Sequence, residues 1–324
     1  MTKLESSPSA LILDGAGSAT PISWDAINDT TLSDGVLWLH MDYKEADTLQ
    51  RISESGGLGP VALEALLAED TRPRSLLIDD GLLIILRGIN RNHGEDADDM
   101  VSLRIWTDAQ RIISVRHRFV AEAEDIRRDL AKGSGPKNSS EFLSQIIYYL
   151  SSRMEETVSE ISDSLDALEE DTFTENAHTL RSDISAIRRK VIRLRRYLAP
   201  QRDVLLKLPA VSASWLQELD RGFLRESGDR MTRYVEDLES AKDRSAIVQD
   251  ELDSRVAART SQTMYVLSII TTIFLPLSLL AGMLGMNVGG IPGQTSPHAF
   301  EFVCAFLVVL AGLQLYLFRR MRWV

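Results

Sequence analysis

Six side chains with a hydroxyl or amide group interrupt a long apolar stretch near the C-terminal end of the sequence: Ser261, Ser268, Thr271, Thr272, Ser278 and Asn287. Polar side chains of this kind can line a narrow pore through a membrane. On an α-helix they form one stripe, at steps of three and four residues, with Met264, Leu267, Leu275, Gly282 and Met286. This polar stripe is typical of a narrow pore wall whose apolar members Met264, Leu267 and Leu275 exclude water. It is equally typical of helix contacts in which small residues allow close approach.

The polar stripe lies in a segment without charge, although 26% of the chain is charged. No Asp, Glu, Lys or Arg occurs from Thr260 to Phe300, or from Phe302 to Phe318. The 23 residues 264–286 make about 35 Å of helix, enough for a hydrocarbon core of about 30 Å. Residues 299–318 are long enough to cross as well, with Glu301 in the first turn, where its side chain reaches the headgroups. We predict two membrane spans, rather than two buried core helices, joined by an outer loop over residues 287–298.

Basic residues flank both predicted spans on the same side. Arg255 and Arg259 precede the first span, a basic tail over residues 319–324 follows the second, and the connecting loop has no Lys or Arg. The positive-inside rule then places both termini in the cytoplasm. The first residues lack the apolar run of a signal peptide, so we expect an inner (plasma) membrane protein whose remaining parts stay in the cytoplasm. Two spans cannot enclose a pathway, and a pore would need several copies of the chain.

The segment before the spans reads as two parts. Residues 1–135 are typical of an α/β domain, with a strand at 36–42, a short helix stopped by Pro73, and hairpins turning at Asp79-Asp80 and at 107–110. A cluster of Gly, Pro and Ser over 132–140 precedes a helical part, residues 136–263. From Asp229 to Leu275 there is neither Gly nor Pro, which permits a stalk helix of about 70 Å running into the first span.

Two further helices before the stalk carry opposite charge. Residues 154–175 contain nine acidic residues and no Lys or Arg, whereas residues 181–202 contain eight Lys and Arg. We favour an antiparallel hairpin that brings these charges together over the alternative of a lipid- or nucleic-acid-binding basic patch.

Composition and spacing exclude several classes of function. The net charge of -11 argues against a nucleic-acid partner, and Cys304, the single cysteine, allows neither an intrachain disulfide nor a cysteine-based metal cluster. His40, His93, His117 and His178 are scattered and read as structural or solvated. No catalytic nucleophile and base can be assembled, so we expect no enzyme. His298 and Glu301 share a helix face at the outer start of the second span, where they either gather zinc or protons or serve as an interfacial anchor.

The C-terminal part of the sequence resembles a known family. "MYVLSIITTIFLPLSLLAGMLGMN", with a short loop, a second span and the tail "RRMRWV", resembles the CorA-type divalent metal ion transporters, whose signature is here Gly285, Met286 and Asn287. The resemblance implies a homopentameric funnel, built from α/β domains, stalk helices and two C-terminal spans, with the first span lining the pore. The continuation "NVGGIPG" is similar to the ZntB-like zinc transporter branch.

The resemblance also implies roles for individual residues. A ring of Asn287 meets hydrated cations at the outer mouth, Met264 and Leu267 lie at a hydrophobic gate, Asp250 belongs to a cytoplasmic acidic ring, and Glu226 to a regulatory metal position. The function implied is transport of divalent cations, Zn²⁺ preferred, without a tightly bound cofactor. Transport of Mg²⁺, Co²⁺ or Ni²⁺ by the same architecture is the alternative, and a membrane-anchored sensor or scaffold is a further one.

Overall fold

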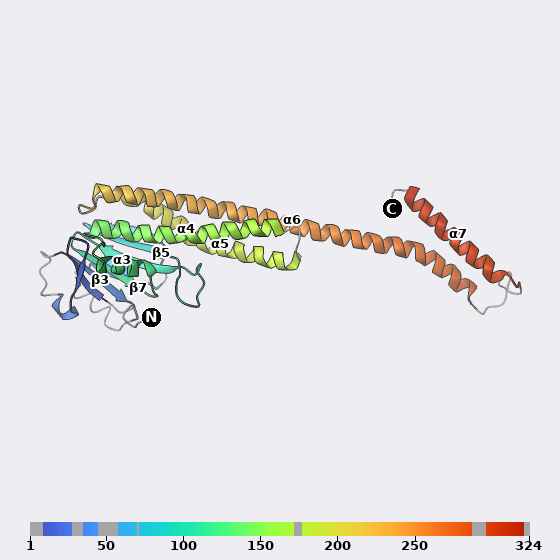
Figure 1. Cartoon of the computed structure of the whole chain (residues 1–324), viewed down its shortest axis with the longest axis horizontal. Coiled ribbons are helices and arrows are strands. Elements are labelled where there is room, and N and C mark those ends of the chain that lie inside the picture. Colours follow the sequence, from blue (N-terminus) through green and yellow to red (C-terminus); the bar gives the residue numbers. More distant parts are fainter. Residues whose placement is uncertain are drawn as a thin grey trace. The chain divides into compact units, whose positions relative to one another are not determined.

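A computed structural model describes residues 9–27, 35–44, 58–69, 71–171, 177–286 and 296–320 of the chain (Figure 1). The chain divides into two compact units, Met1–Gln249 and Asp250–Val324. The signature residue Asn287 and the basic residue Arg322 of the tail lie outside the described residues.

The first unit is built on a seven-stranded sheet in the order β2-β1-β3-β7-β6-β5-β4. The strands are β1 (Ser9–Leu13), β2 (Ala19–Pro21), β3 (Val36–Asp42), β4 (Arg74–Ile78), β5 (Gly81–Gly88), β6 (Val101–Thr107) and β7 (Arg111–Arg116). The predicted strand at 36–42 and both hairpins are confirmed. Asp79, with φ of 53°, and Asp80 form the two-residue turn between β4 and β5, which suits the short polar side chain of Asp. The pair β3 and β7 is parallel, and all other neighbours are antiparallel.

Both faces of the sheet are covered by helices. Leu37, Leu39 and Met41 of β3 pack toward α2 (Pro60–Leu67), while the alternate residue Trp38 packs with Phe142 of α4. This alternation follows from the two-residue period of a strand. All eight residues of β5 are buried, as expected for a strand covered on both sides. A 3-10 turn at Trp24–Ala26 and α3 (Ala121–Ala131) complete the α/β part.

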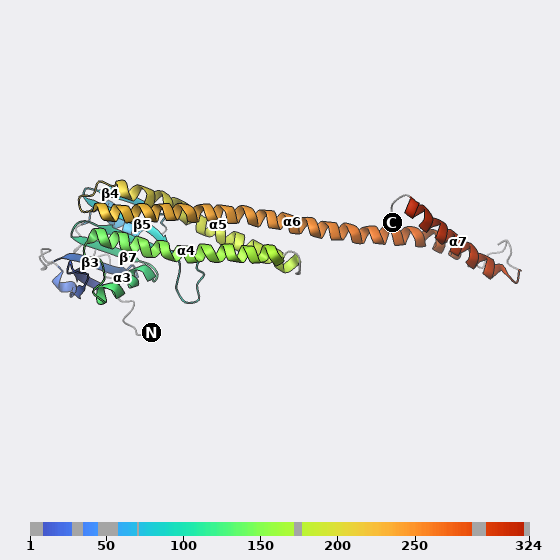
Figure 2. The same ribbon diagram turned by 45° about the horizontal axis from the view of Figure 1, so that its top comes forward.

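Three long helices continue from the sheet. α4 (Ser139–Asp171) and α5 (Ala177–Lys207) form the predicted antiparallel hairpin, and a 3-10 turn (Leu208–Ala210) leads to α6 (Glu218–Leu284). Figures 1 and 2 both show α4, α5 and the first part of α6 running side by side. One hydrophobic core holds sheet and helices together, because Trp38, Phe142, Leu194 and Leu238 belong to the same buried cluster.

The charges of the hairpin find partners beyond it. Arg244 of α6 pairs with Asp166 at 2.5 Å and Glu169 at 2.7 Å, both on α4. On α5, Arg195 pairs with Glu239 of α6, and Arg193 pairs with Asp98 between β5 and β6. The hairpin is confirmed by the two helices, but the ion pairs of Arg193, Arg195 and Arg244 join it to α6 and to the loop between β5 and β6 instead of joining its two helices to each other.

α6 is longer than the predicted stalk. It contains 67 residues and passes through Gly222, Gly228 and Pro276. Gly228 is accommodated because it packs on α5: a Cβ there would lie 3.2 Å from Leu206 Cδ2. Tertiary contacts thus override the weak helix propensity of glycine.

The second unit contains the end of α6 and α7 (Ala299–Arg320). Both helices are long and apolar enough to cross a membrane, and in both the most apolar 18-residue window is unburied. By length and composition this agrees with the predicted spans.

Candidate ion pathway

The polar stripe runs along one side of α6. At about 100° per residue, six of its members lie within about 40° of one line along the helix: Met264, Ser268, Thr271, Leu275, Ser278 and Gly282. Leu267 and Thr272 lie at its two margins. Met264 and Leu275 are 65% and 69% exposed in the single chain. The exposure of these side chains shows a helix face that needs lipid, another helix or a second copy of the chain to cover it.

Two hydroxyl groups of the stripe are held by their own helix. Thr271 Oγ1 donates to the carbonyl of Leu267 at 2.8 Å, and Thr272 Oγ1 donates to that of Ser268 at 2.7 Å. Each hydroxyl satisfies its proton within the helix, and its oxygen keeps a lone pair for an outside donor such as water. The stripe therefore offers neutral acceptors and no fixed charge.

Pro276 adds a backbone acceptor at the same level. Proline has no N–H, so the carbonyl of Thr272, four residues earlier, lacks its usual donor although the helix continues. Inside a bilayer such a carbonyl needs a polar neighbour or a water-lined cavity.

The outer end of the pathway is described only in part. α6 ends at Leu284, and the Gly285 N–H still donates to the Ala281 carbonyl at 2.9 Å. Met286 is 51% exposed. The predicted ring residue, Asn287, lies outside the described residues, so its role stays a prediction.

The other predicted metal positions are separate from one another. His298 Nδ1 lies 3.3 Å from Glu301 Oε2, both side chains being exposed at the start of α7. Glu226 lines a groove of about 410 Å³ between α4 and α6, where Arg230 and Arg233 each lie 3.7 Å from its carboxylate. Asp250 is exposed on α6. Within the described ranges, no three His, Cys, Asp or Glu side chains are grouped so as to hold a metal ion.

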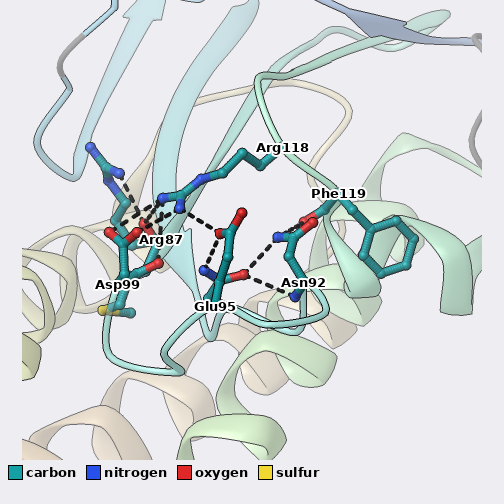
Figure 3. Close-up of polar contacts among 8 residues, drawn as sticks. Arg87, Asn92, Glu95, Asp99, Arg118 and Phe119 are labelled. Atoms are coloured by element: carbon teal, nitrogen blue, oxygen red, sulfur yellow. Dashed lines mark hydrogen bonds and ion pairs between the residues drawn. The ribbon is translucent and has the colours of Figure 1, made fainter.

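The loop between β5 and β6 is acidic and was not among the predicted sites. The run Glu95-Asp96-Ala97-Asp98-Asp99 is the signal that could have pointed to it. Arg118 contacts Asp99 at 2.6 Å and Glu95 at 2.9 Å, and Asn90 donates to Glu95 at 2.7 Å (Figure 3). The hydrogen bond from Arg118 holds the pKa of Asp99 below its ordinary value, and that from Asn90 does the same for the pKa of Glu95. These carboxylates are thus ionised and held by side chains of the protein.

Two of the predicted structural histidines are confirmed in that role. Buried His40 pairs through Nδ1 with Ser114 Oγ at 2.8 Å, and burial lowers its pKa to about 3. His117 stacks on Tyr43 with ring centroids 4.0 Å apart, and burial, aided by Arg104, lowers its pKa to about 4. Both rings are neutral at physiological pH.

Comparison with known proteins identifies the family. The family model described as CorA-like Mg²⁺ transporter protein matches residues 33–320. The chain belongs to the CorA family. The divalent cation transporter CmaX of Pseudomonas aeruginosa is 40% identical over 320 residues, which covers 97% of this chain and 95% of CmaX. The zinc transport protein ZntB of Yersinia enterocolitica is 36% identical, covering 92% of this chain and 90% of ZntB.

The solved structures agree with this assignment. The full-length CmaX structure is 38% identical in sequence and superposes with a TM-score of 0.85. The match covers 99% of this chain and 100% of the CmaX chain. Membership of the CorA family, with its ZntB-like branch, places the chain among membrane transporters and not among enzymes.

Proposed function

We propose that this protein carries divalent metal cations, Zn²⁺ preferred, across the cytoplasmic membrane through the central pore of a homopentamer. In this proposal both termini are cytoplasmic, α6 and α7 span the bilayer, and five copies of α6 turn their polar stripe toward the axis. The observation that carries it is the exposed stripe of neutral oxygens on a helix without charge from Thr260 to Leu284. The zinc and divalent-cation transport named for two relatives support the choice of cargo.

The chemistry of the stripe suits a cation that keeps its water. Hydroxyl, carbonyl and carboxamide oxygens carry partial negative charge, which attracts the ion but binds it weakly enough for release. Gly285, Met286 and a ring of Asn287 would then form the outer filter. Ser268, Thr271, Thr272, Ser278 and Gly282 would line the conduit. Met264, Leu267 and Leu275 would close the pore by excluding water.

Carboxylates outside the stripe take supporting roles in the proposal. Asp250 forms a ring that concentrates cations below the gate, and Glu226 serves as a regulatory metal position. His298 and Glu301 gather cations at the outer mouth. The side chains of all four residues are exposed.

The same architecture supports transport of Mg²⁺, Co²⁺ or Ni²⁺ as the second candidate function. It is favoured by the description of the matched family as Mg²⁺ transporters and by a stripe that lacks the His, Cys and carboxylate ligands that Zn²⁺ prefers. A membrane-anchored sensor or scaffold would make no use of the stripe.

Uptake into proteoliposomes tests the proposal. The native chain is reconstituted around a trapped metal-sensitive dye, and entry of Zn²⁺ and of Mg²⁺ is followed with and without a pH gradient. We expect Zn²⁺ to enter faster, and Asn287→Ala to abolish entry. Gln294→Ala, which removes the other carboxamide of the same loop, is the matched control and should transport normally.

Each component of the proposal has its own contrary result. Normal transport by Asn287→Ala would remove the filter assignment, and entry of Mg²⁺ in preference to Zn²⁺ would establish the second candidate. If the chain is a monomer in mild detergent, the pore is excluded. If neither Zn²⁺ nor Mg²⁺ enters the proteoliposomes, a membrane-anchored sensor or scaffold is the remaining function.

A further inference from the structure

α6 carries a second groove on the side away from the polar stripe. It has a volume of about 570 Å³ and is lined by Arg259, Gln262, Thr263, Val266, Leu267 and Ile270. At about 100° per residue, Arg259, Gln262, Val266 and Ile270 lie at least about 120° from the line of the stripe. Leu267, at the stripe's margin, borders both surfaces. If the stripe faces a pore axis, this groove faces away from that axis.

The groove is polar at one end and apolar at the other. Arg259, Gln262 and Thr263 come first along the helix, and Val266 and Ile270 follow one and two turns further into the predicted span. A surface of this kind matches a molecule with a charged head and a hydrocarbon tail. Its volume is in the range of sites for small molecules, roughly 300–1,000 Å³.

The charge at the polar end is available to an external anion. Arg259 makes no ion pair with the residues that the structure describes, whereas Arg255, one turn earlier, pairs with Glu251 at 2.5 Å. No acidic residue follows Arg259 before Glu301. Arg319 and Arg320 in the last turn of α7 bring further positive charge to the cytoplasmic interface in the proposed topology.

We propose that this groove binds an anionic phospholipid of the inner leaflet. The guanidinium of Arg259 pairs with the lipid phosphate, Gln262 contacts the headgroup, and one acyl chain lies along Val266 and Ile270. Arginine suits this role because its planar guanidinium binds phosphate through two parallel hydrogen bonds. The inference rests on the proposed orientation of α6 in the bilayer and goes beyond the transport function.

Lipid binding to the purified full-length chain tests this site. Phosphatidylglycerol and phosphatidylcholine with identical acyl chains are titrated in mild detergent, and bound lipid is counted by native mass spectrometry. We expect the native chain to prefer phosphatidylglycerol, and Arg259→Gln to bind it roughly fivefold more weakly, the factor that corresponds to one basic residue at a membrane surface. Arg225→Gln, which removes an exposed arginine of the first unit, is the control and should bind like the native chain.

Three results would overturn the proposal: equal binding of the two lipids by the native chain, undiminished phosphatidylglycerol binding by Arg259→Gln, or displacement of the lipid by millimolar inorganic phosphate alone. The first and third use the native chain, so the test stays decisive if the variant does not fold. Arg259→Lys, which keeps the charge, should retain most of the lipid preference. The readout is independent of ion flux, so lipid preference without transport would remove the proposed function and leave this site standing.

Discussion

Leu275 and Leu277 offer a matched pair for testing which side of α6 faces the pore. Leu275 lies on the polar stripe, and Leu277 lies two residues further, about 200° around the helix. In the pore proposal Leu275 closes the pathway by contact with its copies, whereas Leu277 contacts lipid or α7. We expect Leu275→Ser to hold the pore open and Leu277→Ser to leave flux unchanged.

The size of the effect follows from the exposure of Leu275. Its side chain belongs to a residue that is 69% exposed in the single chain. Covering that much of a leucine is worth about 1.4 kcal/mol, taking about 2 kcal/mol for complete burial. Five copies would give up to about 7 kcal/mol to the closed state, and losing even a fifth of this shifts the equilibrium about tenfold. Leu275→Ser should therefore raise resting flux at least about tenfold.

The assay is the rate of dye response in proteoliposomes, normalised to the amount of pentamer recovered by size-exclusion chromatography. Faster flux in Leu277→Ser than in Leu275→Ser, with both variants assembled, would refute the assignment of the stripe to the pore. Unchanged flux in both would show that Leu275 takes no part in closure.

Two further predictions concern the first unit. A Cβ at Gly222 would meet open space, so Gly222→Ala should stabilise α6 by about 1 kcal/mol. Gly228→Ala should stabilise α6 less, because its Cβ would lie 3.2 Å from Leu206 Cδ2. Thermal unfolding followed by circular dichroism compares the two variants, and equal shifts would contradict the packing argument. Glu122 of α3 is fully buried, with Arg153 Nη1 at 3.6 Å and Asp125 nearby, and burial raises its pKa. A raised pKa means that the stability contributed by the protonated form is lost as pH rises through that pKa. Glu122→Gln should therefore unfold at a higher temperature than the native chain at pH 8, with a smaller difference at pH 5; a difference that grows toward pH 5 would reverse the sign of this argument.

Local patterns were sufficient to predict the short-range elements of the fold. The hairpins at Asp79-Asp80 and at 107–110 were predictable because polar turn residues separate two apolar runs in each. The parallel pairing of β3 with β7 was not, since it joins segments about 75 residues apart whose alternation fits many neighbours.

Long-range partners account for what the sequence could not specify. The acidic run on α4 and the basic run on α5 suggested each other as partners, yet Arg244 of α6 binds Asp166 and Glu169. Charge sign alone does not say which of three adjacent helices is nearest. In the same way, the predicted stalk began at Asp229, yet α6 continues through Gly228, whose packing against Leu206 only the structure shows.

The candidate pathway divides in the same manner. The spacing of Met264, Thr271 and Leu275 was enough to place them on one face, because a helix fixes angles from sequence numbers. The inference about the Arg259 groove rests on the observation that Arg259 has no carboxylate partner among the described residues. Only the three-dimensional structure could show this.

Pro276 has a consequence for how this helix can change during evolution. The acceptor that it creates is the main-chain carbonyl of Thr272, so replacing the side chain at position 272 leaves that acceptor in place. Its availability is instead encoded four residues away, where any residue other than proline would supply the missing N–H. The free carbonyl of Thr272 in the predicted span is thus conserved only as long as Pro276 is conserved, although Pro276 need not contact the permeating ion. A survey of the variants tolerated at position 272 alone would overlook this acceptor.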